Sequence, residues 1–272
     1  MASKLTFTFP PNVEADLGHA PESKKVRNLI RTGEITGTSR GLAPGFVQCN
    51  LAILPKAYAF EFMLYCQRNQ RACPVLEVCD VGNHEPRRLA PGADLRTDCA
   101  RYAVYVDGVR QPDRTEIVDL WRSDLVAFLI GSGITFDAAL ERYGVPTDRH
   151  RWVLRTELPT APAGPFSGNL IVTMRWLTAA QALVAAQVTA RFPFNHGAPV
   201  HIGDPAQIRA DIGTPLFGGP VPTCPKELVP VFWACGVTPQ SAAESARLPL
   251  FIAHAPAHSF ITDLPTTALE QP

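Results

Sequence analysis

Proline and glycine are spread along the whole chain, and no other feature of the sequence limits its fold so strongly. The 272 residues include 26 prolines and 19 glycines. Proline fixes φ and removes a backbone donor, whereas glycine admits positive φ, so both residues interrupt helices and strands and shape turns. We therefore expect short helices and strands joined by many ordered loops, with functional side chains on those loops.

The remaining composition is typical of a globular chain. Hydrophobic residues make up 46% and charged residues 18%, which is enough apolar surface to build a core without disulfides. The 25 Lys and Arg residues balance the 25 Asp and Glu residues, so the charge predicts neither a nucleic-acid nor a membrane partner. A small carboxylate substrate remains compatible with this balance, because one pocket can be positive in a neutral protein. Self-association into a homo-oligomer is left open.

Two apolar segments bear on the location of the protein. The N-terminal sequence MASKLTFTFPPNVEADLG lacks the apolar core of a signal peptide, and the run LVAFLIG is too short to cross a bilayer. We therefore expect a cytoplasmic protein with reduced cysteines. The spacing of Cys66, Cys73 and Cys79 does not match a C-x-x-C zinc site, so most cysteines are expected to be small buried hydrophobic residues. No metal or other cofactor is predicted.

Periodicity and turn residues predict alternating helices and strands. Helices are expected at residues 22–32, 56–70, 115–131, 135–144 and 178–192, the last with Thr178 as its N-cap. Strands are expected at residues 74–78, 151–158, 169–176, 228–236 and 249–256. Residues 100–109 alternate up to an Asp107-Gly108 turn, which predicts a β-hairpin.

This alternation predicts an α/β fold in which a mixed sheet is flanked by helices and a second, smaller α+β subdomain is present. We expect an N-terminal α+β part over residues 1–150 and a C-terminal α/β part over residues 151–272 that carries most of the site. The boundary is expected within GVPTDRHRW, residues 144–152. The sequence leaves open whether the two parts interleave.

The stretch RFPFNHGAPVHIGDP, residues 191–205, concentrates titratable groups among three prolines. Imidazole titrates near neutral pH and suits proton transfer, and a nearby carboxylate can orient it. We therefore predict His196, His201 and Asp204 as catalytic residues. The alternative is that one histidine is a hydrogen-bonded core residue and that Asp204 caps a turn.

Two further segments carry candidate residues. A buried strand in VFWACGVTPQ ends at Cys235, and strand ends commonly reach ligand crevices in α/β folds. Cys235, Thr238 and Gln240 are predicted to contact substrate, with Cys235 either a nucleophile or a structural thiol. His254, in HAPAHSFITD, is a fourth catalytic candidate. His258 follows four residues later, but the intervening proline disfavours the helical geometry of a zinc pair.

Arginines and a glycine-rich loop are the remaining candidates for binding. Arg96, Arg155, Arg175 and Arg191 each lie beside apolar sequence, and a guanidinium can hold both oxygens of a substrate carboxylate. The alternative for each is a structural ion pair. Residues 37–50, GTSRGLAPGFVQCN, match neither a dinucleotide fingerprint nor a Walker loop. A backbone nest for a carboxylate and an ordinary loop are equally open there.

Long stretches of the chain, taken together, resemble one known family from near one end to the other. The matching stretches are RTGEITGTSRGLAPGFVQCNLAILP, YCQRNQRACP, LRTDCARYAVYVDG, FLIG, PAGPF, RFPFNHGAPVHIGDP, PVFWACGVTPQ and HAPAHSFITD. The family is that of the hydro-lyases related to the catalytic module of mitochondrial D-glutamate cyclase. The resemblance implies an α/β fold with a smaller α+β part and the cyclisation of D-glutamate to 5-oxo-D-proline with loss of water. Asn50, in the first stretch, completes the predicted substrate-binding set.

The chain departs from the family pattern at five positions. Ser132 stands where the family usually has cysteine and Asp137 where it has glutamate, while Glu157, Thr160 and Ala257 replace asparagine, cysteine and glycine. The resemblance therefore leaves the substrate open. Alternatives to D-glutamate cyclisation are the hydration or dehydration of another carboxylic acid, and a carboxylate-binding accessory protein without catalysis.

Overall fold

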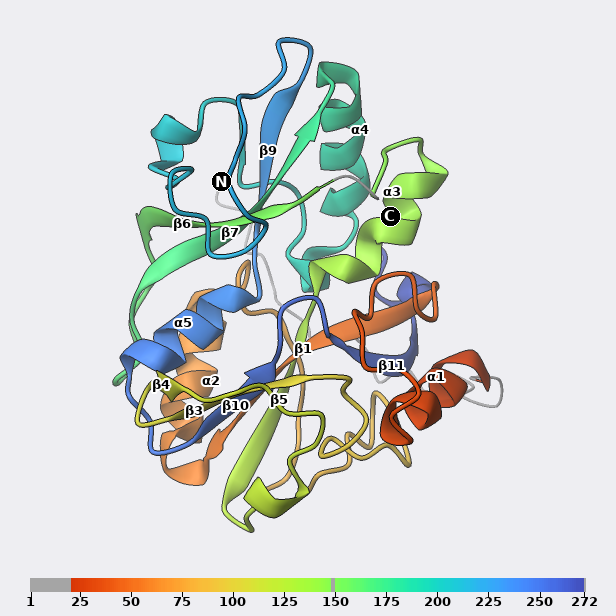
Figure 1. Ribbon diagram of the computed structural model, residues 1–272, viewed down its shortest axis with the longest axis vertical. Helices are drawn as coiled ribbons and strands as arrows, with labels where there is room; N and C mark the ends of the chain where they lie inside the picture. Colours follow the sequence, from red (N-terminus) through yellow and green to blue (C-terminus); the bar gives the residue numbers. More distant parts are fainter. Residues whose placement is uncertain (1–20, 148–149, 272) are drawn as a thin grey trace, which may run out of the picture.

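Two β-sheets form the framework of the protein, and the helices pack against them (Figure 1). The computed structural model describes residues 21–147 and 150–271. The N-terminal sequence in which no signal peptide is expected lies outside these residues. Every paired strand in the described part runs antiparallel to its neighbour.

The larger sheet has seven strands in the order β2-β5-β1-β10-β3-β4, with β11 also paired to β1. Its strands are β1 (Phe46–Pro55), β2 (Val75–Val78), β3 (Tyr102–Val106), β4 (Val109–Arg110), β5 (Leu125–Gly131), β10 (Phe251–His254) and β11 (Phe260–Pro265). The smaller sheet has the order β6-β7-β9-β8. Its strands are β6 (Trp152–Pro159), β7 (Asn169–Leu177), β8 (His201–Ile202) and β9 (Val229–Ala234).

The helices are short, as the proline and glycine content predicts. The α-helices are α1 (Pro21–Arg31), α2 (Ala59–Arg68), α3 (Asp137–Arg142), α4 (Ala179–Ala190) and α5 (Val237–Ser245). Single 3₁₀ turns are η2 (Lys56–Tyr58), η3 (Val118–Leu120), η4 (Gly133–Phe136), η5 (Pro193–Asn195), η6 (Pro205–Ile208) and η7 (Thr266–Ala268). Helix α4 begins at a capping box, in which Thr178 and Gln181 satisfy each other's backbone donors.

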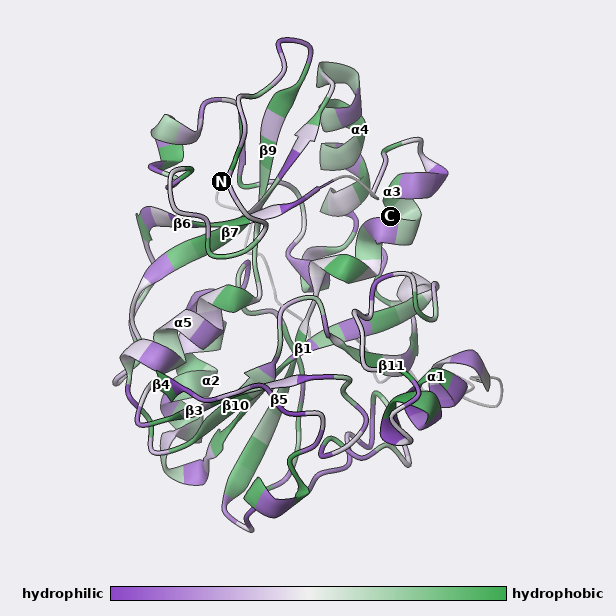
Figure 2. Cartoon of the chain, in the orientation of Figure 1, coloured by the Kyte–Doolittle hydropathy of each residue, from purple (hydrophilic) through white to green (hydrophobic). Residues whose placement is uncertain are grey.

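The larger sheet is buried on both faces. Alternate residues of β5 enter two separate apolar clusters, one formed with the loops of residues 79–117 and one with helices α2 and α5. Figure 2 shows β5 as hydrophobic along much of its length. Helix α5 also contacts β7, so it connects the two sheets. In the smaller sheet, α3 and α4 cover the face that carries Trp233.

One predicted helix is wrong. Residues 115–131 form the turn η3 and the buried strand β5 instead of a helix. The run LVAFLIG is apolar at every position, and such a run fits a strand buried on both faces as well as a buried helix. The Asp107-Gly108 hairpin, the helix over residues 178–192 and the strands predicted near residues 74–78, 151–158, 169–176, 228–236 and 249–256 are confirmed.

The predicted α/β class with subdomains is confirmed, although the antiparallel pairing of all described ladders was not foreseen. Chain order does not separate the two sheets. Strands β10 and β11 return to the larger sheet after the chain has built the smaller one, which is the interleaving that the sequence left open. The division of the chain into two domains near residues 144–152 stays a prediction.

Candidate active site

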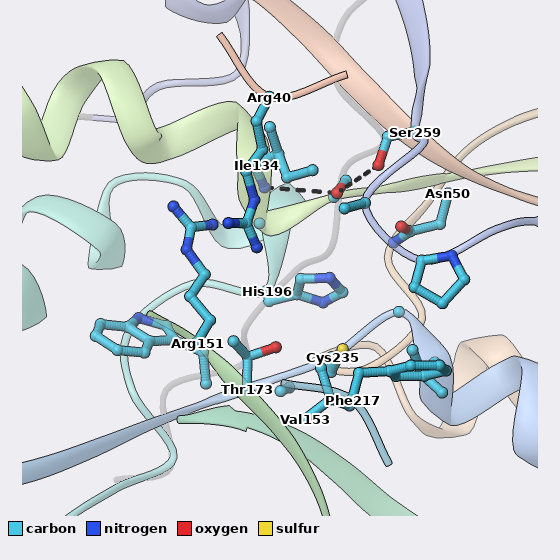
Figure 3. Close-up of a pocket in the computed structure, with 18 of the residues that line it drawn as sticks. Arg40, Asn50, Ile134, Arg151, Val153, Thr173, His196, Phe217, Cys235 and Ser259 are labelled. Carbon is cyan, nitrogen blue, oxygen red and sulfur yellow. Dashed lines mark hydrogen bonds between the residues drawn. The ribbon is translucent and has the colours of Figure 1, made fainter. Parts of the chain in front are cut away.

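A cavity of about 420 Å³ lies between the two sheets and gathers side chains from most of the chain. Asn50 comes from β1 and His254 from β10 of the larger sheet, while Thr173 and Arg175 come from β7 of the smaller one. Figure 3 shows Arg151 on one side, Asn50 and Ser259 on the other, and His196 between them. The volume falls in the range of small-molecule sites.

One end of the cavity is cationic. Asp137 accepts from Arg151 at 2.6 Å and from Arg175 at 2.8 Å, so one carboxylate serves two guanidinium groups. Arg175 is buried, and the rings of Phe136 and Trp233 lie 5.8 and 5.3 Å from its guanidinium carbon. Burial lowers the pKa of Arg175 to about 10, which leaves it charged at neutral pH.

Three guanidinium nitrogens at this end have no hydrogen-bond partner within the described residues: Nε and Nη1 of Arg175 and Nε of Arg151. Each of these atoms is buried. Leaving a buried charged donor without an acceptor is costly, and a carboxylate is the group that a guanidinium fork binds best. Arg40 is a third guanidinium in the lining. This end of the cavity is therefore suited to an anion.

His196 reaches the cavity from a turn that follows η5. Its φ of 76° is left-handed, a conformation in which histidine is enriched among non-glycine residues. The preceding Asn195 donates to the Ser132 carbonyl and to Thr135, so the turn is fixed against the end of β5. Nδ1 of His196 lies 2.9 Å from the Arg71 carbonyl oxygen. Burial lowers the pKa of His196 to about 4, so the ring is uncharged at neutral pH.

His254 ends β10 and is also buried. Its Nδ1 accepts a hydrogen bond from the Leu51 backbone N–H at 3.2 Å. The Gln240 amide nitrogen lies 3.3 Å from the same Nδ1 and donates to the His254 carbonyl oxygen. Burial lowers the pKa of His254 to about 4. Two uncharged imidazoles therefore line a cavity whose other end carries guanidinium groups.

The cavity lining near Asn50 and Gly236 is closely packed. A Cβ on Gly236 would lie 2.0 Å from the Asn50 amide nitrogen, so only glycine fits where α5 begins. Ser132 and Ser259 form a buried hydroxyl pair at 3.1 Å, which Figure 3 draws as a dashed line from Ser259. Burial raises the pKa of Cys235, so its sulfur in the lining is a neutral thiol.

Five of the residues predicted from the sequence line this cavity. They are His196, His254, Asn50, Arg175 and Cys235. Thr238 and Gln240 lie behind the lining instead. Thr238 exchanges hydrogen bonds with the Ile171 backbone, and Gln240 contacts His254.

His201 and Asp204 do not reach the cavity. Strand β8 pairs His201 with Phe232, and the two rings lie 5.6 Å apart on the face of the smaller sheet that points away from Trp233. The Nε2 atom of His201 contacts the Asp204 carbonyl oxygen at 2.9 Å. The Asp204 carboxylate is exposed and caps η6 by accepting from Ala206. This arrangement matches the alternative in which Asp204 caps a turn.

Three of the four predicted arginines also lie elsewhere. Arg96 holds Asp94 at 2.7 Å, and Arg191 holds Glu270 at 3.1 Å. Arg155 is exposed on β6.

Sequence reasoning missed several lining residues, notably Arg40, Arg151, Ser259 and Thr173. Arg40 belongs to the glycine-rich loop of residues 37–50, whose sequence is compatible with a carboxylate nest, so a local signal for it exists. Arg151 precedes β6 without any motif around it.

Among the described residues, no three His, Cys, Asp or Glu side chains form a group that could hold a metal ion. No helix in that part of the chain is long and apolar enough to cross a membrane.

The chain is similar to known proteins over most of its length. A family model described as D-glutamate cyclase matches residues 126–263. "Putative hydro-lyase GK2103" from Geobacillus kaustophilus is 48% identical over 249 residues, which cover 89% of this chain and 94% of the relative. "Putative hydro-lyase BLi00500/BL02808" from Bacillus licheniformis is 50% identical over 246 residues, covering 88% and 94%. "Putative hydro-lyase" from Stutzerimonas stutzeri is 49% identical over 245 residues, covering 88% and 92%.

Among solved structures, the nitrogen repressor-like protein MJ0159 from Methanococcus jannaschii is a distant match. It is 13% identical, with a TM-score of 0.36 over 84% of this chain and 90% of that chain. Such a score is too low to support a conclusion about fold or function.

Proposed function

The chain belongs to the D-glutamate cyclase family, whose relatives carry the name hydro-lyase, and from this premise we propose that it cyclises D-glutamate to 5-oxo-D-proline with loss of water. The reaction joins the amine to the γ-carboxyl carbon of the same molecule. Because both groups belong to one substrate molecule, much of the entropic cost of bringing them together is avoided. The protein must bind the carboxylates, free the amine of its extra proton and protonate the departing oxygen.

One observation carries this proposal: a cavity end lined by guanidinium groups faces two uncharged imidazoles. Arg40, Arg151 and Arg175 outnumber Asp137, and no carboxylate belongs to the described lining of the cavity. An environment of this charge favours a substrate that carries two carboxylates. It also disfavours an ammonium group, because like charges oppose its protonated form. The amine is therefore expected to bind in its neutral, nucleophilic state.

The lining residues divide into groups with different expected contacts. Arg175 and Arg151, fixed by Asp137, would attract one carboxylate by their positive charge. Asn50 and Cys235 lie farther along the lining, where a second polar group of the substrate would sit. Donors that are already in place when negative charge develops lower the barrier without reorganisation.

The decisive experiment is incubation of the purified protein with D-glutamate, with 5-oxoproline followed by ¹H NMR. L-Glutamate at the same concentration is the control for stereochemistry, and buffer without protein gives the spontaneous rate. We expect catalysed formation of 5-oxoproline from the D-isomer. An unchanged spectrum after long incubation, with folded protein present, would contradict the proposal.

A second candidate is the dehydration of a hydroxy acid of similar size. It is favoured by Ser132, which stands in the cavity lining where the resembling family usually has cysteine. It is also favoured by the absence of a carboxylate from the described lining, since a hydroxy acid brings no ammonium group to be paired. Glu157, the other departure that suggested a different acid, is exposed and pairs with Arg209 outside the cavity.

The same NMR assay separates the candidates. Turnover of 2-hydroxyglutarate without turnover of D-glutamate would select the dehydration. Binding of D-glutamate without any product, measured by calorimetry, would select the third alternative, a carboxylate-binding accessory protein.

A further inference from the structure

The two buried imidazoles of the cavity are held in opposite tautomers. A neutral imidazole carries one proton, and the hydrogen bond at one ring nitrogen decides which nitrogen holds it. His196 and His254 both line the cavity, and each uses Nδ1 for a bond to the protein, while no described residue bonds to Nε2. Their partners at Nδ1, however, are of opposite kinds.

At His196 the partner is an acceptor. The Arg71 carbonyl oxygen lies 2.9 Å from Nδ1, and a carbonyl oxygen can only accept. The proton of His196 is therefore on Nδ1, and Nε2 carries a lone pair. The left-handed turn and the bonds of Asn195 to Ser132 and Thr135 keep the ring in this orientation.

At His254 the partner is a donor. The Leu51 backbone N–H donates to Nδ1 at 3.2 Å, so this nitrogen has no proton and Nε2 carries it. The Gln240 amide nitrogen, 3.3 Å from Nδ1, adds a second donor on the same side. Leu51 lies on β1 beside β10, so the sheet itself sets the tautomer.

We propose that Nε2 of His196 is the general base that takes a proton from the substrate amine and that the Nε2–H of His254 is the general acid that protonates the departing γ-carboxyl oxygen. This assignment rests on the proposed D-glutamate reaction. Gln240 and the Arg71 carbonyl are positioning groups, because they act through the imidazoles and do not line the cavity.

The proton count closes with solvent water as the only proton reservoir. The ammonium nitrogen of D-glutamate carries three protons: one is lost to solvent when the amine binds in its neutral form, one passes to His196, and the lactam nitrogen keeps the third. The departing γ-carboxylate oxygen takes one proton from solvent and one from His254 and leaves as water. The N–C bond forms as His196 accepts and the C–O bond breaks as His254 donates. His196 then releases its proton to solvent and His254 takes one up, which restores both tautomers.

The other titratable groups of the described lining are less suited to these steps. The guanidinium groups stay protonated, and burial raises the pKa of Cys235. Burial also lowers the pKa of both histidines, but a bound dicarboxylate opposes this effect because nearby negative charge favours imidazolium. His196 can therefore hold the proton that it takes from the amine until the product leaves.

The tautomers are measurable without any substrate. In protein with ¹⁵N-labelled histidine, two-bond ¹H–¹⁵N correlation spectra at pH 7 distinguish the nitrogen that bears the proton. We expect an Nδ1–H ring for His196 and an Nε2–H ring for His254, with assignment from the spectra of His196→Asn and His254→Gln. The reverse pattern, or a protonated ring, would overturn the assignment even if D-glutamate proves to be the substrate.

A substrate with a better leaving group distinguishes the general base from the general acid. On D-glutamate both variants should lose a factor on the order of 10²–10⁴ in kcat. The γ-(2,2,2-trifluoroethyl) ester of D-glutamate releases a better leaving group, so it needs less help from an acid. On this ester, after subtraction of spontaneous cyclisation, His254→Gln should recover most of the wild-type rate and His196→Asn should keep its deficit.

Recovery of His196→Asn instead, or equal deficits of both variants on the ester, would overturn the division of roles. Circular dichroism and the melting temperature report whether each variant is folded, and the tautomer spectra of the wild type decide the matter if one is not. Failure of the wild type to convert D-glutamate would contradict the proposed function, whereas the tautomers of the two rings would still be measured independently of that failure.

Discussion

The stretch from residue 191 to 205 has two halves with opposite placements. The first half, around His196, is buried and lines the cavity, whereas the second half, around His201 and Asp204, lies on the far side of the smaller sheet. Both halves offer an imidazole among prolines and glycines. The comparison teaches that local composition marks a stretch as functional without telling which of its titratable groups meet the substrate.

The physical cause is the alternation of side chains along β9. His201 pairs in register with Phe232, whose ring faces the outer cluster, while the next residue, Trp233, faces the cavity. His196 lies outside the strands and reaches the cavity from a left-handed turn, which is fixed by Asn195. A shift of one residue in the β8 register would turn His201 to the other face.

The largest effect should come from substituting His196, with the same substitution at His201 as the comparison. His196→Asn retains a residue that tolerates the left-handed conformation but removes the base, so kcat on D-glutamate should fall by a factor on the order of 10²–10⁴. His201→Asn should stay within about two-fold of the wild type, as expected for a substitution away from the site. Steady-state assays of 5-oxoproline formation measure both, and a strong loss in His201→Asn would remove the distinction between the halves.

The arginines allow the same comparison within one sheet. Arg175→Met removes a buried guanidinium with unpaired donors and should lower kcat/KM by a factor on the order of 10²–10³. Arg155→Met, on the adjacent strand β6, removes an exposed guanidinium and should leave kcat/KM nearly unchanged. Equal losses in the two variants would show that substrate does not bind at the cationic end.

The buried histidines should also make stability depend on pH. The pKa of His196 and of His254 is lowered to about 4, below the value of about 6.5 in an unfolded chain, so the unfolded state binds more protons between these values. The free energy of unfolding should therefore fall as the pH falls through this window and be unaffected by these groups above it. The loss is about 3 kcal/mol per histidine by pH 4.

Urea unfolding from pH 7 to pH 4 measures this dependence. His196→Asn should show a shallower decline than the wild type, and His201→Asn should follow the wild type. Arg71 and His258 are the charged or titratable neighbours that act on the two rings, and both also disfavour imidazolium. Identical slopes in all three proteins would contradict the burial of an uncharged His196.

The smallest effect should come from Gly131, which packs against the turn that carries His196. A Cβ on Gly131 would lie 1.7 Å from the Phe194 carbonyl oxygen, so Gly131→Ala must displace the turn that carries His196. We expect a loss of about 1–3 kcal/mol in stability, read as a lower melting temperature, together with slower turnover. Gly213→Ala is the matched control, because its nearest neighbour would be 3.4 Å away, and it should change neither quantity.

Some elements could be predicted because their signals are local. The Asp107-Gly108 turn and the N-cap at Thr178 depend on residues that are neighbours in sequence, and both are found where expected. Strand β5 was predicted as a helix because its apolar run carries no period, and only pairing with β1 and β2 makes it a strand.

The candidate site was predicted in part for the same reason. His196, His254, Asn50 and Cys235 stand in motifs, and Arg175 is an arginine within an apolar strand; these local features indicated function before their partners were known. Arg151 has no such local signal, and its place beside the other groups depends on how the two sheets meet.

The sequence by itself determined the family, the α/β class and the pool of imidazoles and guanidinium groups from which a site could be built. Only the tertiary structure decided which of them share a cavity and in which protonation state. The reason is that burial and the hydrogen-bond partner at Nδ1, which decide the charge and tautomer of His196 and His254, come from the distant residues Arg71 and Leu51.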